Sequence, residues 1–335
     1  MPLGYIGKRL AMAIPTLFGV AVVVFVLLRV VPGDPIAMML PPGARADDIE
    51  RLRALYGLNH PIVEQFGRWL LDLVTGNFGT SISLHQGVFG LIMSRLPATL
   101  ELALAALVVA TAAGVLFGVA AAYWRGRWPE VAVDALTGLG MAIPDFLWAL
   151  LLVLALGVLL PVLPISGRID PRTEISFVTE FYLAESFVRG EFAVAGSLLA
   201  HMVLPVAALA LPLTAAISRI LKGAINEAMS QDYILMARVK GFSKARIVWR
   251  EALRNALVPA VTLSGVQFTF LIGGTVLVER IFGYPGIGNM AIGAVIDRDL
   301  PLIQGIVLIF AVLFIVVNLL VDMTYVAINP RIRHG

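Results

Sequence analysis

Long apolar stretches alternate with short polar segments along the whole chain. An α-helix needs about 20 apolar residues to cross the hydrocarbon core of a bilayer, so each long stretch predicts one membrane span. Six stretches are long enough, and they cover residues 10–31, 98–123, 131–160, 197–221, 257–278 and 302–328. Pro144 interrupts the third stretch, while Pro205 and Pro212 lie inside the fourth, which membrane helices tolerate. The pattern predicts an all-α integral membrane protein with six transmembrane helices.

The polar segment at residues 32–96 separates the first two predicted spans. Asp47 and Asp48 can cap a short helix, and Gly57 can end it. Pro61 suits the first turn of a second helix that Gly76 ends, and residues 88–93 form a third, weaker helical piece. Such amphipathic helices either pack at the membrane interface, which we prefer, or cover the outer mouth of a pathway.

The stretch from Asn226 to Pro259 is basic and helix-forming, unlike the apolar sequence around it. Together with Arg219 and Lys222 it carries eight of the 25 Lys and Arg residues. Positive charge accumulates in cytoplasmic loops, so this loop is predicted to be cytosolic. With six spans, both termini then lie inside, an N-in/C-in topology. It places fourteen cations in inner segments and ten in outer segments, and all four lysines fall inside.

Composition agrees with a bilayer location. Of the 335 residues, 59% are hydrophobic and 14% are charged, and the mean hydropathy is +0.90. Soluble domains carry about 25% charged residues. The net charge of +3 does not indicate nucleic acid as a partner, because the cations are spread over loops and no zinc-finger or RNA-binding pattern is present. The absence of cysteine excludes disulfides, thiol nucleophiles and cysteine-ligated clusters.

Motifs for enzyme chemistry are sparse. The chain has no G-x-x-x-x-G-K-[ST] sequence and therefore does not hydrolyse nucleotide through a P-loop. Its four histidines are scattered, which predicts no metal site. Ser197 and His201 share a helix face, so an intramembrane hydrolase is the enzyme alternative. No G-x-S-x-G motif supports it, and a chance polar pair is the simpler interpretation.

Ionisable residues inside the predicted spans are the other chemical signals. Each costs about 2.5–3.5 kcal/mol at a helix centre on insertion scales, so those present usually face a cavity or another helix. The residues that we consider for a pathway or gate are Asp145, Glu101, His201 and Asp322. Asp145 can line a cavity or hydrogen-bond between helices, whereas a structural role is preferred for Asp322.

The cytosolic loop has the pattern of a docking element. A helical pattern opens at Asp232, Gly241 breaks it, and Ser243 can cap a second short helix at residues 244–251. A helix–glycine–helix unit anchored in the membrane at both ends suits a partner protein, although a surface helix that binds anionic lipid is the alternative. The loop covers residues 222–256, and its expected docking residues are Glu227, Asp232, Tyr233, Ala237, Arg238, Lys240, Gly241, Ser243, Arg246 and Arg254.

These residues carry a resemblance to a known family. The loop from Asp232 to Ser243, with the segment from Ala252 to Pro259 after it, resembles the loop of ABC-importer permeases of the dipeptide/oligopeptide/nickel family. Other matching segments run along the chain, namely 31–35, 95–102, 285–288, 318–322 and 329–334. The Ser166-Gly167-Arg168 loop and the C-terminal segment look closest to the dipeptide branch.

The chain departs from the general importer motif of the loop. That motif places Glu-Ala-Ala before a glycine and Ile-x-Leu-Pro after it. In the Glu-Ala-Ala and glycine part only Ala237 and Gly241 agree. Further along, Leu253-Arg254 stands where Leu-Pro is expected, and the proline comes later, at Pro259. The departure concerns the expected ends of the local helices and not the expected docking role.

The resemblance implies a type I ABC importer permease fold in a bacterial inner membrane. It implies a heterodimer with a homologous second permease, two ABC ATPase subunits below, and an extracytoplasmic solute-binding protein above. ATP and Mg would be bound by the ATPase subunits, with no cofactor in this chain. Dipeptides are the expected cargo, and longer peptides, glutathione, nickel chelates, haem and glycans stay open.

The resemblance and the span pattern together predict three regions. Residues 1–31 hold the cytosolic N-terminus and the first span, which we interpret as an uncleaved anchor. Residues 32–96 form an extracytoplasmic helical segment. Residues 97–335 form the permease core, which contains the other five spans and the cytosolic coupling loop.

Overall fold

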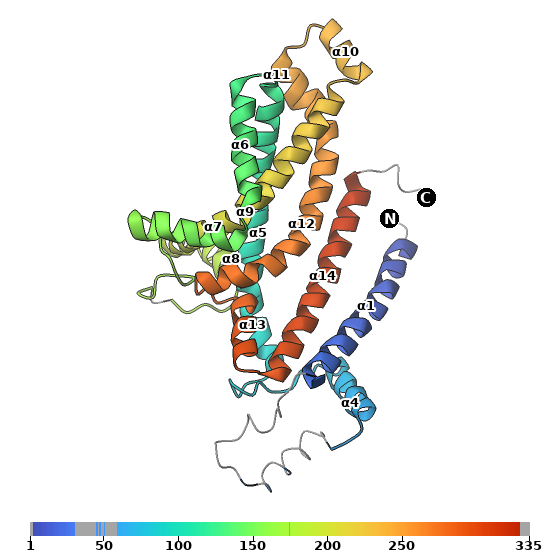
Figure 1. Cartoon of the computed structure of the whole chain (residues 1–335), viewed down its shortest axis with the longest axis vertical. Coiled ribbons are helices and arrows are strands. Elements are labelled where there is room, and N and C mark those ends of the chain that lie inside the picture. Colours follow the sequence, from blue (N-terminus) through green and yellow to red (C-terminus); the bar gives the residue numbers. More distant parts are fainter. Residues whose placement is uncertain are drawn as a thin grey trace. The chain divides into compact units, whose positions relative to one another are not determined.

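The computed structural model describes residues 3–30, 45, 47, 50, 59–173 and 175–328 (Figure 1). These residues are largely helical, and apart from an isolated bridge between Thr80 and Gly87 they contain no strand. Most of the helix predicted to begin at Asp47 and end at Gly57 lies outside the described residues, as do the segments 31–35 and 329–334. The all-α prediction is confirmed.

Several helices are long and apolar enough to cross a membrane. Three qualify alone within the described residues: α5 (Val88–Tyr123), α9 (Phe192–Ala228) and the Leu300–Met323 part of α14 (Leu300–Ile328). Two bent helix pairs raise the number to as many as five. Helix α1 (Leu3–Val30) adds a shorter apolar stretch, Ala11–Val26. The prediction of a membrane-spanning helical protein is therefore confirmed.

One compact unit comprises Met1–Leu96 and Met290–Val316. In it, α4 (Ile62–Val74) packs on α1 through aromatic rings: Phe25 lies 5.0 Å from Phe66 and 5.4 Å from Trp69 between ring centroids. The predicted second outer helix thus exists, and its amphipathic face meets a neighbouring helix. The separate piece predicted at residues 88–93 is wrong, because these residues are the first turns of α5, which continues through Pro97.

The second unit comprises Pro97–Asn289 and Val317–Gly335. Its central helix, α9, packs against α6 (Trp128–Ala142), α7 (Asp145–Leu152), α8 (Tyr182–Val188) and α12 (Leu253–Ile281). Helix α5 approaches α9 closely at Gly114 and Gly118, a G-x-x-x-G pair. A Cβ atom on Gly114 would lie 2.8 Å from the Ile217 side chain, and one on Gly118 2.9 Å from the Ser218 carbonyl oxygen. Glycine therefore sets this helix–helix distance.

The third predicted span is broken where the sequence indicates. Helix α6 ends at Ala142, and α7 starts at Asp145 after Pro144, with a bend of 104° between α6 and the Asp145–Leu159 segment. Proline disfavours a helical residue before it, and Ile143 is accordingly extended, with ψ 125°. Helix α7 then continues as a π-helix at Val153–Leu159.

Candidate functional site

The loop at residues 222–256 forms a protruding helical turn at one end of the second unit (Figure 1). Helix α10 (Asp232–Val239) ends before Gly241, whose φ of +74° is a left-handed conformation that favours glycine. Ser243 caps the next helix, α11 (Lys244–Arg246), by accepting a hydrogen bond from the Arg246 N–H. The predicted helix–glycine–helix order is thus present.

The sequence predicts that the second helix of the loop ends near residue 251. In the structure the helix continues beyond that residue. Helix α11 passes into a π-helix at Ile247–Ala252, which passes directly into α12. No glycine or proline separates these pieces, and Pro259 lies inside α12. The loop is therefore joined to a membrane helix by unbroken helical backbone.

One side of α10 anchors the loop and the other side is exposed. Ile234 and Ala237 are buried among residues of α5, α9 and α12. Ala237, which we expected at the docking surface, instead belongs to this core. The other expected docking residues are exposed: Glu227, Asp232, Tyr233, Arg238, Lys240, Gly241, Ser243, Arg246 and Arg254.

Large apolar side chains lie among these exposed polar residues. Leu235, Met236 and Val239 are 61%, 58% and 76% exposed, and Trp249 is 49% exposed. The Arg246 guanidinium lies 3.7 Å from the centroid of the Phe242 ring, which holds both side chains in place. We call the exposed residues of α10 and α11, with Gly241 and Trp249, the docking surface. An apolar patch ringed by charge is typical of a protein-binding site.

A pocket of about 300 Å³ lies beside the break between α6 and α7. Asp145 and Gln267 supply its polar side chains, and the rest of the lining is mainly apolar, including Leu213, Phe270 and Leu271. Of the four ionisable residues that we considered for a pathway, Asp145 is the one in this pocket.

Glu101 belongs instead to a buried ion pair. Its Oε2 lies 2.7 Å from Nη2 of Arg168, and the two side chains are 9% and 4% exposed. The Arg168 guanidinium also stacks 3.9 Å from the Tyr182 ring centroid, and Glu101 accepts a hydrogen bond from the Leu183 N–H. Burial raises the pKa of the neighbouring Tyr284 phenol above its usual range. The cluster ties α5 to the segment between α7 and α9, at Arg168, Tyr182 and Leu183.

Glu279 is a second buried carboxylate, and the sequence pattern did not mark it as a candidate residue. Its Oε1 accepts a hydrogen bond from the Thr99 hydroxyl at 2.7 Å, and its Oε2 accepts one from the Asn289 N–H at 3.0 Å. The Thr99 oxygen also accepts from the Ile287 N–H, at the start of α13 (Ile287–Ile296). Glu279 and Thr99 thus satisfy backbone donors at the N-terminus of α13, which a span pattern cannot reveal.

The remaining candidate residues, Ser197, His201 and Asp322, do not come together as a catalytic site. The Ser197 hydroxyl accepts a hydrogen bond from the Asp170 N–H, and Nδ1 of His201 lies 2.8 Å from the Ser197 carbonyl oxygen. This geometry gives no nucleophile–base pair for a hydrolase. Asp322 is half-buried on α14. Among the described residues no cluster of His, Asp and Glu can hold a metal.

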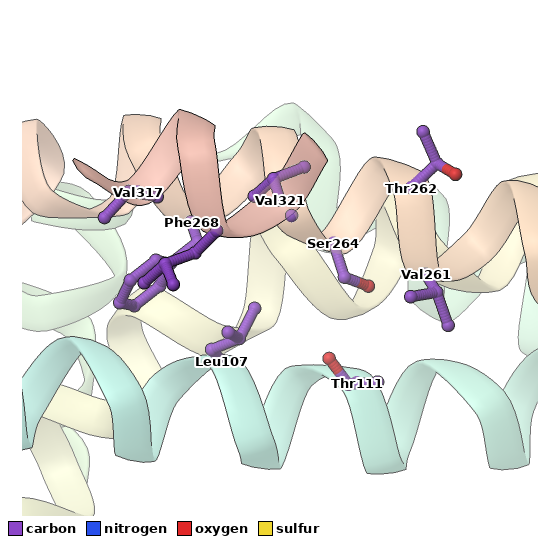
Figure 2. Close-up of a pocket in the computed structure, with 10 residues that line it drawn as sticks. Leu107, Thr111, Val261, Thr262, Ser264, Phe268, Val317 and Val321 are labelled. Atoms are coloured by element: carbon purple, nitrogen blue, oxygen red, sulfur yellow. The ribbon is translucent and has the colours of Figure 1, made fainter. Parts of the chain in front are cut away.

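An apolar cavity of about 240 Å³ lies between α5, α12 and α14 (Figure 2). Figure 2 shows Leu107 and Thr111 projecting from α5 towards α12, with Phe268 beside Leu107. The Ser264 hydroxyl bonds to a carbonyl of its own helix. The lining holds no charged group, so this cavity is poorly suited to a polar cargo.

Comparisons with known proteins agree with this architecture. Residues 114–334 match the family described as binding-protein-dependent transport system inner membrane component, and residues 2–103 match the N-terminal family of such membrane components. The chain is 39% identical over 337 residues to the di/tripeptide transport system permease protein DppB of Pseudomonas aeruginosa, covering 99% of each chain. It is 36% identical over 332 residues to the glutathione transport system permease protein GsiC of Escherichia coli K12, again covering 99% of each.

A solved structure shows the same fold. A chain of the inward-facing MetNI methionine ABC transporter aligns with a TM-score of 0.51 and 15% identity, over 69% of this chain and 93% of the other. The family resemblance and the type I ABC importer permease fold expected from the sequence are thus confirmed. The chain belongs to the binding-protein-dependent transport system inner membrane components and is a permease subunit of an ABC importer.

Proposed function

We propose that this permease forms half of the translocation path of an ATP-driven importer of small peptides, and that its docking surface receives an ATPase subunit. The relatives named for di/tripeptide and glutathione transport support peptides as cargo, since glutathione is itself a tripeptide. The observation that carries the proposal is the docking surface: exposed apolar and basic residues on a turn whose other side is built into the helical core.

The assembly follows from this role. A homologous second permease completes the path as a heterodimer, two ABC ATPase subunits bind ATP and Mg, and an extracytoplasmic solute-binding protein delivers cargo. Six spans with both termini in the cytosol place the coupling loop, residues 222–256, on the ATPase side. The lysine distribution supports this topology, because all four lysines then face the cytosol. Residues 32–96 then lie outside, and residues 97–335 form the permease core.

Variants at the docking surface test the proposal in the complete complex. Gly241→Glu adds a bulky anion at a position where a Cβ atom meets nothing within 4 Å, so the added side chain meets no steric clash there, although the φ of +74° strains the backbone of any residue other than glycine. The matched control is Gly241→Asn, because asparagine tolerates the left-handed conformation. Gly241→Glu should abolish peptide uptake and cargo-stimulated ATP hydrolysis while the chain stays inserted, and Gly241→Asn should retain both.

A second pair of variants, at Val239, separates the effect of a new charge on the docking surface from the effect of a changed side-chain shape. Val239→Glu places a carboxylate on the exposed apolar face, whereas Val239→Thr keeps the side-chain shape. We expect uncoupled ATPase activity and low uptake from the first variant only. Normal coupling in both Gly241→Glu and Val239→Glu would refute the docking role. Uptake of nickel chelates, haem or glycans in place of peptides would refute the proposal that small peptides are the cargo.

A further inference from the structure

The pocket beside the α6–α7 break presents one carboxylate in a membrane-spanning segment. Asp145 is the first residue of α7, directly after Pro144. Its Oδ1 accepts a hydrogen bond from the Phe146 N–H at 2.7 Å, which uses one of its two oxygens. The neighbouring pocket residues, such as Leu209 and Leu213, offer no positive charge.

No described lysine, arginine or histidine pairs with Asp145. Two buried or half-buried cations of the same unit are engaged elsewhere: Arg168 with Glu101, and Lys222 with Glu130 and Asp134. A carboxylate within a membrane span is costly, and it is retained where it faces water, a partner or a cargo. Oδ2 of Asp145 accepts no hydrogen bond from the described residues, so the carboxyl group has an oxygen that can bind a cation.

The carboxylate of Asp145 packs against Gly274 of α12, where the absence of a side chain leaves room for it. A Cβ atom on Gly274 of α12 would lie 2.9 Å from Oδ2 of Asp145. Any other residue at this position would push the carboxylate from its place. The next residue along, Gly273, has no such restriction, since its Cβ would meet nothing within 4 Å.

We infer that Asp145 binds the α-ammonium group of the peptide as it crosses the membrane, an inference that rests on the proposed function. Small peptides differ in their side chains but share a free amino terminus, which is largely protonated at neutral pH. One carboxylate in a mainly apolar pocket can hold this shared group while the apolar wall accepts varied side chains. The pocket volume of about 300 Å³ is near the lower limit for small-molecule sites, which suits a dipeptide better than a long peptide.

A cysteine in the pocket tests the charge directly. The chain contains no cysteine, so Ala216→Cys, at a residue that lines the pocket, gives it a unique thiol. In the complete complex in liposomes, a cationic methanethiosulfonate reagent should modify this thiol about tenfold faster than an anionic one, because the carboxylate attracts one and repels the other. Modification of this chain is read by mass spectrometry.

Adding Asp145→Asn to Ala216→Cys should remove most of that preference. The matched control is Asp170→Asn, which removes the same charge from an exposed residue of the outer segment and should leave the preference unchanged. Equal rates for the two reagents with Asp145 present, or a preference that survives Asp145→Asn, would overturn the inference. Failure of both reagents to react would also overturn it, because the pocket would then be closed to a water-soluble cargo.

Protection by peptides identifies the group that binds. Alanyl-alanine should slow the modification of Ala216→Cys at concentrations about tenfold lower than N-acetyl-alanyl-alanine, and Asp145→Asn should remove this difference. Equal protection by the two peptides with Asp145 present would mean that the carboxylate does not bind the ammonium group.

Uptake kinetics separate this inference from the proposed function. Gly274→Ala should raise the KM for alanyl-alanine several-fold with little change in kcat, whereas Gly273→Ala should change neither. Normal uptake in Asp145→Asn and Gly274→Ala would leave the importer assignment intact and remove the ammonium site. No peptide uptake in the parent complex would instead refute the proposed function, and the charge preference of the thiol would still report on Asp145.

Discussion

Removing one partner of the Glu101–Arg168 pair is the sharpest stability prediction. The pair joins α5 to the segment before α8 through a 2.7 Å contact, and both side chains are almost fully buried. Arg168→Met keeps much of the side-chain volume but removes the cation, its stacking on Tyr182 and its hydrogen bond to the Glu180 carbonyl oxygen. The Glu101 carboxylate would then remain buried without its cation.

The structure sets the expected size of the effect. Breaking a buried ion pair by removing one partner costs about 3–5 kcal/mol, because the other charge stays buried and unpaired. At about 2–4 °C for each kcal/mol, the thermal midpoint should fall by roughly 6–20 °C. The double variant Glu101→Gln/Arg168→Met removes both charges and should recover at least half of that loss, since neither unpaired charge remains.

Thermal unfolding of the purified complex in detergent measures these shifts. The matched control is Arg172→Met, at an exposed arginine of the same segment, which should change stability by less than about 0.5 kcal/mol. An Arg168→Met midpoint equal to that of Arg172→Met would refute the reasoning. So would a double variant as unstable as the single one, because the loss would then come from packing and not from an unpaired charge.

Three further predictions concern packing, hydrogen bonding and pH. Gly114→Ala should lower stability by about 1–3 kcal/mol through overpacking against α9, and Gly138→Ala, where a Cβ has open space, should not. Thr99→Val should cost about 1–3 kcal/mol, because Glu279 loses a donor and an α13 backbone N–H loses its acceptor. Burial alone would raise the pKa of Asp299, but hydrogen bonds from two serines hold it below its usual value, so its stabilisation is present above about pH 4 and is lost as pH falls through the lowered pKa. The thermal midpoint should therefore fall more steeply below about pH 4 in the parent than in Asp299→Asn; identical profiles would contradict this assignment.

The sequence predicted features that depend on local chemistry. Apolar length located the long helices, Pro144 marked the break between α6 and α7, and Gly241 marked the turn of the docking surface. In each case one residue or one stretch determines the backbone by itself, because proline and glycine restrict or permit particular dihedral angles. The family resemblance then supplied the fold class.

Contacts between distant residues could not be predicted in this way. Arg168 and Glu101 lie 67 residues apart, and Ser81 and Asp299 are separated by 218. Neither pair follows a periodic pattern, because such pairs depend on how helices pack and not on the sequence near either residue. Ala237 shows the same limit, since the loop sequence marks it for docking while helix packing buries it.

The unbroken helix that leaves the docking surface acts as a lever arm. It runs from Lys244 to Phe268 before a bend of 51° leads to the segment starting at Phe270. At 1.5 Å per residue its length is about 37 Å, so a tilt of about 5° at the loop moves the far end by roughly 3 Å. That far end carries Gln267, which lines the Asp145 pocket, and Phe270 beyond the bend lines it too. A small push at the docking surface would thus become a displacement comparable to one hydrogen-bond length beside Asp145.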